Sequence, residues 1–398
     1  MSVRMAPVVD AAPAGAKAPL WLLALLTFSG TLAMHIFVPA LTIAAADLGA
    51  TASAMQMTIS LYIAGLAVGQ LIYGPLSDRF GRRPVLMAGL SLYTLAGLAA
   101  AFAPDAQSLI AARLFQAFGG CAGLVLGRAL VRDTAGNMDA AKRMALMNLM
   151  VTIGPGVAPM VGGAVAGTIG WRAIFWLLCG LGVANFLLTW RMVPETVKPV
   201  AGGGAAVIRN YGRLLVSPAF LGYAVGGACA TTSMYAYVAA APFLFVQELG
   251  RPAFEVGIYL AVLVFGIWIG SIAASVLVSR LSPRAMLFYG NGLSTLAAFG
   301  LLGIVFAGAL SVPLVVGLMI LFTLGMGVAS PAAMTRAISV NAAAVGSASG
   351  LYGSIQMGVG ALCAALASIG PSPVLAAALV LAGACVVAQV AFYRAARS

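Results

Sequence analysis

Charged residues are scarce in this sequence. Only 8% of its 398 residues are Asp, Glu, Lys or Arg, whereas 62% are hydrophobic. A soluble domain carries about 25% charged residues. So few charges cannot cover a surface that faces water, which excludes an ordinary soluble enzyme or binding module. Most of the chain is therefore expected to face lipid.

Residues for metal or redox chemistry are also lacking. The single histidine, His35, excludes a His-based metal cluster. No two cysteines have metal or redox spacing, and each lies inside an apolar run: Cys121, Cys179, Cys229, Cys363 and Cys385. No phosphate-binding glycine loop occurs, and no nucleophile–base pair can be assembled. We expect no cofactor, no metal and no enzymatic activity.

Long apolar runs are present instead. A membrane-spanning helix needs about 20 mostly apolar residues. The first run is too long to be the apolar part of a cleaved signal peptide. The sequence predicts an all-α membrane protein of twelve transmembrane helices, at 20–44, 54–76, 84–103, 107–129, 143–166, 172–193, 218–246, 255–279, 284–307, 312–334, 345–369 and 372–393.

The positive charges predict an orientation. With both termini inside, every Lys and Arg except Arg113, Arg172 and Arg251 falls in a cytoplasmic segment. This bias is typical of cytoplasmic loops. It also explains the formal charge of +12 without nucleic acid, because the basic residues form short clusters between apolar runs.

The longest internal break divides the chain into two six-helix halves, 19–193 and 218–393. Residues 1–18 and 394–398 are expected to be cytoplasmic tails, the first of them disordered. The segment 194–217 is either a plain polar linker or carries a short helix on the membrane surface. Identical residues recur in the two halves at the same separation along the chain, which indicates a parallel repeat. The pairs are Gly65 and Gly266, Gly69 and Gly270, Arg79 and Arg280, Arg83 and Arg284, and Gly89 and Gly290.

The loop after the second run, residues 74–83, reads GPLSDRFGRR. It resembles the loop signature of the major facilitator superfamily. Asp78 is expected to face the positive N-terminus of a helix beginning near Val345, or to pair with Arg132. The resemblance implies an inner gate, with a simple basic turn as the alternative; its residues are Gly74, Asp78, Arg79, Gly81, Arg82, Arg83 and Arg132.

Two further motifs resemble signatures of the same superfamily. Arg113 and Gln116 in the fourth run match an R-x-x-Q-x-x-G pattern; such a buried arginine is expected to face a cavity, unless it snorkels to the outer interface. The fifth run resembles the antiporter signature, which implies export, although the same residues could serve ordinary helix packing. They are Gly154, Pro155, Gly156, Pro159, Gly162 and Gly163.

Smaller matches are similar to one branch, the drug:proton antiporters that export bicyclomycin and chloramphenicol. They are Phe37 to Leu41, Arg128-Ala129, Arg132-Asp133, Trp171-Arg172, Phe175, Pro194 to Thr196, Tyr237 and Ala241 to Phe243. The resemblance implies the twelve-helix superfamily fold, two six-helix pseudo-repeats, and a bacterial inner membrane with both termini cytoplasmic. We expect a monomer.

One position departs from that branch, whose members usually carry Asp four residues before Pro39. His35 stands there, and no carboxylate lies deep in any run. A proton carrier must titrate near neutral pH, as histidine does. We hypothesise that His35 carries the coupled proton and that Arg113 sets its affinity. The alternative is a neutral His35 bonded to Gln116 or to a backbone carbonyl.

These features predict a proton-driven exporter of small amphipathic compounds, neutral or weakly anionic because no deep acid would attract cations. A proton-coupled importer, an uncoupled facilitator and a sensor on the same fold remain alternatives. Adaptable apolar side chains with a few polar groups suit a substrate cavity. The expected lining is Met34, Tyr62, Gln116, Asn148, Thr231, Tyr235, Tyr259, Tyr352 and Gln356.

Overall fold

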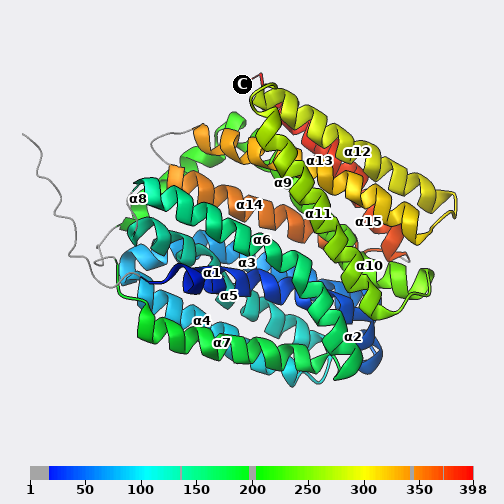
Figure 1. The fold of residues 1–398 in the computed structure, drawn as a ribbon, viewed down its shortest axis with the longest axis horizontal. Helices are drawn as coiled ribbons and strands as arrows, with labels where there is room; N and C mark the ends of the chain where they lie inside the picture. The colour runs from blue at the N-terminus through cyan, green and yellow to red at the C-terminus, as the bar shows by residue number, and fades with distance from the viewer. Residues whose placement is uncertain (1–17, 135–136, 197–202, 341–344, 371, 398) are drawn as a thin grey trace, which may run out of the picture.

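The computed structural model describes residues 18–134, 137–196, 203–340, 345–370 and 372–397. Within these ranges the chain is helical, without strands, and its long helices run side by side (Figure 1). Eleven helical segments there are long and apolar enough to cross a membrane. Together with α6 (Asn137–Thr168) they make twelve, which confirms the expected all-α membrane architecture.

The first half holds six of these segments. Its first span consists of α1 (Leu20–Ile36), the 3₁₀ turn η1 (Val38–Ala40) and α2 (Leu41–Asp47). The others are α3 (Ala52–Phe80), α4 (Arg82–Ala101), α5 (Ala106–Thr134), α6 and α7 (Arg172–Met192).

In the second half, the first span consists of α9 (Pro218–Thr232), α10 (Met234–Phe243) and the π-helical turn η2 (Leu244–Glu248). The others are α11 (Ala253–Leu277), α12 (Pro283–Phe306), α13 (Val312–Ser339), α14 (Val345–Leu366) and α15 (Pro373–Ala395).

The break in the first span has a local cause. Pro39 lacks an N–H, and its ring would clash with the carbonyl four residues earlier, which is that of His35. The helix therefore ends at Ile36, and the Phe37 N–H turns to the His35 carbonyl. The break places His35 in the last turn of α1, where carbonyl groups are left without helical partners.

The predicted repeat is visible in how the glycines pack. A Cβ on Gly89 would lie 3.1 Å from the Gly119 carbonyl oxygen of α5, and one on Gly290 would lie 2.8 Å from the Gly325 carbonyl oxygen of α13. Gly65 approaches α5 and Gly266 approaches α13 in the same way. In each half, glycines from two helices allow close contact with the fourth spanning helix.

Two pairs of helices join the halves: α3 packs along α14, and α6 packs along α11. α8 (Gly203–Leu215) lies at one end of the bundle, where α3 ends and α4 begins; we call this the basic end (Figure 1). The opposite end, near α2 and α10, is held together by a bond from Gln56 Nε2 to the Ala239 carbonyl oxygen at 3.3 Å.

Candidate functional site

His35 lies at the interface between the halves. Its side chain is 6% exposed, and Nδ1 is 2.8 Å from the Thr31 carbonyl oxygen. The ring borders a cavity of about 30 Å³ between α1, α6, α10 and α11. The other lining residues are Pro155, Pro159, Met234, Val238, Leu260, Leu263, Val264 and Ile267. His35 is therefore the one ionisable group in an otherwise apolar pocket that both halves build.

Arg113 is fully buried inside the first half and does not snorkel. Its Nη1 donates to the Ala33 carbonyl oxygen and to Gln116 Oε1, both at 2.9 Å. The guanidinium lies 4.1 Å from the centre of the Tyr62 ring. Among the described residues no carboxylate pairs with it. Its charge is instead balanced by the partly negative C-terminal end of α1 and by aromatic faces.

No hydrogen bond joins His35 to Arg113. His35 faces α10 and α11, whereas Arg113 contacts the Ala33 carbonyl from within the first half. Gln116 likewise bonds to Arg113, so the backbone partner of His35 is the Thr31 carbonyl. Arg113 therefore does not act on His35 through a direct hydrogen bond.

The α6 motif is packed between α1 and α11. A Cβ on Gly162 would lie only 1.7 Å from the Ile36 carbonyl oxygen of α1. A Cβ on Gly163 would lie 3.2 Å from Phe254 Cα of α11. Gly154 faces Phe28 of α1, and Gly156 faces Val264 of α11. These glycines let α6 touch both neighbours at backbone distance, immediately beside His35.

The loop motif forms a compact charge cluster at the basic end. Arg82 Nη1 pairs with Asp78 Oδ1 at 2.6 Å, and Arg82 Nε pairs with Asp133 Oδ2 at 3.1 Å. Gly81 turns the chain with a φ of +96°, a conformation that favours glycine. This cluster connects the α3–α4 junction to the end of α5.

The expected pair between Asp78 and Arg132 is not formed. The partner of Asp78 is instead Arg82, the first residue of α4, which the turn at Gly81 places beside the end of α3. Asp78 and the start of α14 border the same cavity of about 440 Å³ without bonding to each other. Tyr211 of α8 lines that cavity too; burial, and then the Asp78 carboxylate, raises the pKa of its phenol.

Arg79 and Arg83 have separate roles in the loop. Arg79 stacks on the Phe80 ring, with its Cζ 5.1 Å from the ring centre. Arg83 donates to the Trp190 carbonyl oxygen at 2.6 Å, which ties the loop to the end of α7. A Cβ on Gly74 would meet no atom within 4 Å, so this glycine does not serve a close contact between helices.

Comparison with known proteins decides the family. A family model described as Major Facilitator Superfamily matches residues 23–365. The chain belongs to the major facilitator superfamily. Its fold agrees: a bacterial homologue of the human lysosomal transporter Spinster, inward-facing and unoccupied, superimposes with a TM-score of 0.71. That match covers 95% of this chain and 96% of the other, at 16% identity.

Two relatives match this chain over nearly the whole of both sequences. An uncharacterized MFS-type transporter of Bacillus subtilis, YdgK, is 29% identical, and the match covers 94% of each chain. A bicyclomycin resistance protein homologue of Haemophilus influenzae is 27% identical, with 90% of this chain and 91% of the relative covered. The resemblance to the drug antiporter branch is thereby confirmed at the level of sequence.

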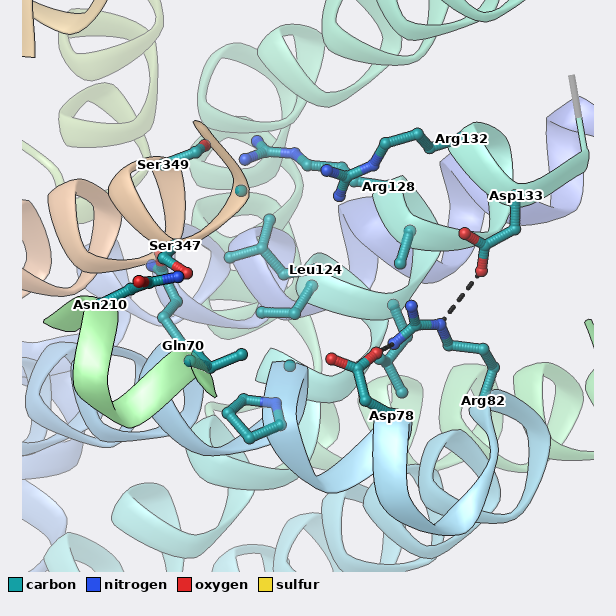
Figure 2. A pocket seen from close by; sticks show the side chains of 18 of the residues that line it. Gln70, Asp78, Arg82, Leu124, Arg128, Arg132, Asp133, Asn210, Ser347 and Ser349 are labelled. Carbon is teal, nitrogen blue, oxygen red and sulfur yellow. Dashed lines mark hydrogen bonds and ion pairs between the residues drawn. The ribbon is translucent and has the colours of Figure 1, made fainter. Parts of the chain in front are cut away.

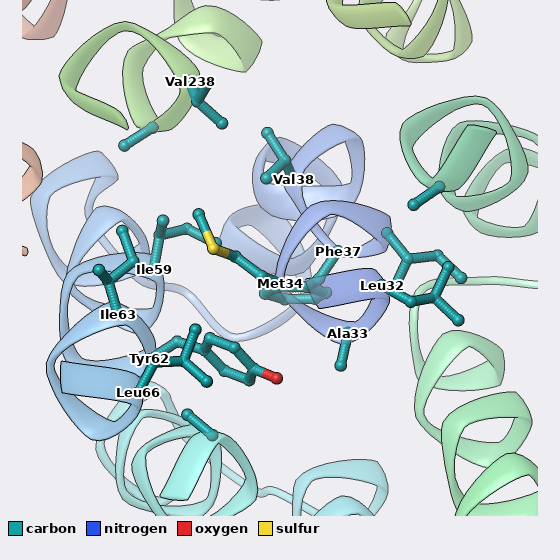
Figure 3. Close-up of a cluster of buried hydrophobic side chains, with 14 of the residues drawn as sticks. Leu32, Ala33, Met34, Phe37, Val38, Ile59, Tyr62, Ile63, Leu66 and Val238 are labelled. Carbon is teal, nitrogen blue, oxygen red and sulfur yellow. The ribbon is translucent and has the colours of Figure 1, made fainter. Parts of the chain in front are cut away.

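The side chains expected to line a substrate cavity are dispersed in this protein. Met34 is buried beside Ile59 and Ile63 of α3 (Figure 3), and Tyr62 donates to the Gly30 carbonyl oxygen at 2.7 Å. Thr231 accepts from Gln356 Nε2 at 2.9 Å. The cavity at His35 and the cavity at the basic end are lined by other residues, and not by Met34, Tyr62, Thr231 or Gln356.

The remaining expected lining residues also occupy different places. The Tyr235 ring centre is 6.3 Å from that of His35, at the interface of the halves. Tyr352 packs against Gly227 within the second half. Tyr259 donates to Glu255, which is paired with Arg251 near the opposite end. The side chain of Asn148 lies outside the described part of the chain.

Sequence reasoning missed the role of Glu195. Its two carboxylate oxygens accept the backbone N–H groups of Arg82, at 2.9 Å, and Arg83, at 3.1 Å. These groups begin α4 and have no partner within the helix, so Glu195 caps it from more than a hundred residues away. The branch match at Pro194 to Thr196 was the available signal.

Proposed function

We propose that this chain is a secondary active transporter that exports small amphipathic compounds in exchange for protons. The observation that carries the proposal is the place of His35. It is the titratable group between the halves, and it borders the prolines of the antiporter motif. A carrier that rocks its two halves around that interface would give the ring access to each side in turn.

The family supports transport as the activity, and the relative named for bicyclomycin resistance supports export of drugs. We further propose that the protein works as a monomer in a bacterial inner membrane, without nucleic acid as a partner. The basic end and both termini would then face the cytoplasm, in agreement with the excess of positive charge there.

The test is replacement of His35 by Gln, which keeps a hydrogen-bonding side chain of similar size but does not titrate near neutral pH. We expect substrate-driven proton flux in inverted vesicles to fall to the level of vesicles without transporter. The assay would use a drug panel that includes bicyclomycin and chloramphenicol. His35→Asp should restore flux, because it again places a titratable group at the interface.

Undiminished flux in His35→Gln would remove His35 from coupling. Flux that never depends on protons, even in the unaltered protein, would indicate a facilitator. Proton movement in the same direction as the drug would indicate import by symport. Ligand binding without any flux would indicate a sensor.

A further inference from the structure

The cavity at the basic end contains positive groups that pair with no carboxylate in the described part of the chain. It has a volume of about 440 Å³ and lies between α3, α5, α8 and α14. Five charged side chains border it. Arg82 binds both carboxylates, those of Asp78 and Asp133. Arg128 and Arg132, one turn apart on α5, are left without an acidic partner among the described residues.

Arg128 is the more unusual of the two. Its Nε is buried and makes no hydrogen bond. A guanidinium taken out of water without a counter-charge or full hydrogen bonding is costly. Arg113 also has two buried guanidinium nitrogens without a hydrogen bond, but its Nη1 is bonded to a carbonyl oxygen and to Gln116, and aromatic rings cover it. Among the described residues, no such group contacts Arg128. The half-buried Arg128 guanidinium can therefore accept a negatively charged partner from the cavity that it borders.

The start of α14 adds a third positive element to this place. Gly346, Ser347 and Ser349 of its first turns line the cavity. A Cβ on Gly346 would lie 3.8 Å from Arg132 Nη1. The first N–H groups of a helix have no helical partner and carry a partial positive charge, so they attract anions.

Figure 2 shows how these groups converge. Arg128 and Arg132 extend from α5 toward Ser349, whereas Asp78, Arg82 and Asp133 form a separate cluster. The two arginines and the helix start thus point to one space, with the paired carboxylates turned to Arg82. The remaining wall is partly apolar, with Leu124, Val125 and Val207.

We propose that this cavity binds an amphipathic organic anion, with its carboxylate or sulfonate on Arg128, Arg132 and the start of α14. The apolar wall would take the hydrocarbon part, and the volume is within the range of small-molecule sites. This inference rests on the proposed export function, because it names an anionic class of substrate for the cavity through which a cytoplasmic compound would enter.

The experiment compares two probes of the same shape on the full-length protein, in nanodiscs of zwitterionic phosphatidylcholine. They are 2-naphthoate, an anion, and 2-naphthamide, its neutral counterpart. Calorimetric titration against empty nanodiscs gives both affinities. We expect the naphthoate to bind at least about tenfold more tightly, as one charge-assisted hydrogen bond can provide.

Arg128→Gln and Arg132→Gln should each weaken naphthoate binding about tenfold and leave naphthamide binding unchanged. Arg209→Gln, on the exposed face of α8 and outside the cavity lining, is the matched control and should change neither. Arg128→Lys and Arg132→Lys keep the charge and should retain more affinity than the Gln variants. A higher naphthoate affinity in the Lys variants than in the Gln variants would show that the lost charge, and not a damaged fold, weakens binding.

Equal affinity for the two probes would overturn the proposal. So would Gln variants that bind naphthoate as the unaltered protein does, or a Lys variant no better than its Gln counterpart. The binding assay needs no proton gradient. Normal naphthoate binding together with absent proton coupling would therefore count against the export function and leave this site standing.

Discussion

At the scale of single residues, Arg113 illustrates how a charge is kept inside a membrane protein without an acid. Its partners are the Ala33 carbonyl, the amide oxygen of Gln116 and the ring of Tyr62. The Ala33 carbonyl belongs to the last turn of α1, which the break before Pro39 makes partly negative. The break and the buried arginine therefore support each other.

The ring and the hydroxyl of Tyr62 should contribute to stability separately, the ring through Arg113 and the hydroxyl through the Gly30 carbonyl. Tyr62→Phe loses the bond to the Gly30 carbonyl and should cost about 1 kcal/mol of unfolding free energy. Tyr62→Leu also removes the ring from the guanidinium, which should add about 0.5–2 kcal/mol beyond the lost volume. Thermal unfolding of the purified variants measures both.

Phe220→Leu is the control for lost aromatic volume, since Phe220 is fully buried in the second half, away from Arg113. The difference in unfolding free energy between Tyr62→Leu and Tyr62→Phe should exceed the loss measured for Phe220→Leu. If it does not, the ring does not stabilise the charge of Arg113.

At the scale of elements, α6 is one of the four helices that join the halves. One set of its glycines faces α1 and another faces α11, so a single helix connects the broken first span to the second half. Glycine allows backbone contact that any side chain would prevent. The antiporter motif is in this sense a packing motif, located where His35 meets the other half.

Gly162→Ala should disrupt that packing. The new methyl would lie 1.7 Å from the Ile36 carbonyl oxygen, so α6 and α1 must move apart next to His35. Overpacking of this kind costs about 1–3 kcal/mol. We expect a lower unfolding temperature and a loss of proton-coupled transport.

Gly167→Ala provides the comparison on the same helix, because a Cβ there meets nothing within 4 Å. It should leave both the unfolding temperature and transport unchanged. Similar losses in the two variants would mean that the helix does not tolerate alanine in general, and that the contact with Ile36 is not the cause.

At the scale of the whole molecule, the two ends of the bundle differ. The opposite end is joined between the halves, where Ser368 Oγ lies 3.8 Å from Met57 Sδ of α3. The basic end holds the 440 Å³ cavity between α3 and α14. Transport by rocking requires the joined end to separate at some stage of the cycle.

A disulfide across the opposite end should therefore stop transport. In Met57→Cys with Ser368→Cys, oxidation would hold α3 against the end of α14, and reduction should restore activity. The five native cysteines are buried and unpaired, so they should interfere little. Each single substitution serves as a control in the same efflux assay.

Full transport by the oxidised double variant, with cross-linking verified by mass, would contradict this. The opposite end would then not need to separate, and rocking of the two halves would not be the mechanism.

The sequence by itself determined the helical spans, the two halves and the family. Apolar runs are local signals, because each span must satisfy its own backbone in lipid whatever its neighbours are. The loop motif at residues 74–83 and the α6 glycines could be recognised for the same reason, since their residues are contiguous. The breaks at Pro39 and Ser233 fell inside runs that looked continuous.

Only the tertiary structure decided which side chains meet. His35 and Ala33 are two residues apart on α1, yet the His35 side chain borders the second half, whereas the Ala33 carbonyl accepts from Arg113 within the first half. Arg82 pairs with Asp133, and Arg128 and Arg132 border one cavity with the start of α14, through the rotation and packing of helices far apart in the chain. Hydrophobic periodicity carries no information about such rotations within a membrane, where lipid-facing and buried sides are both apolar.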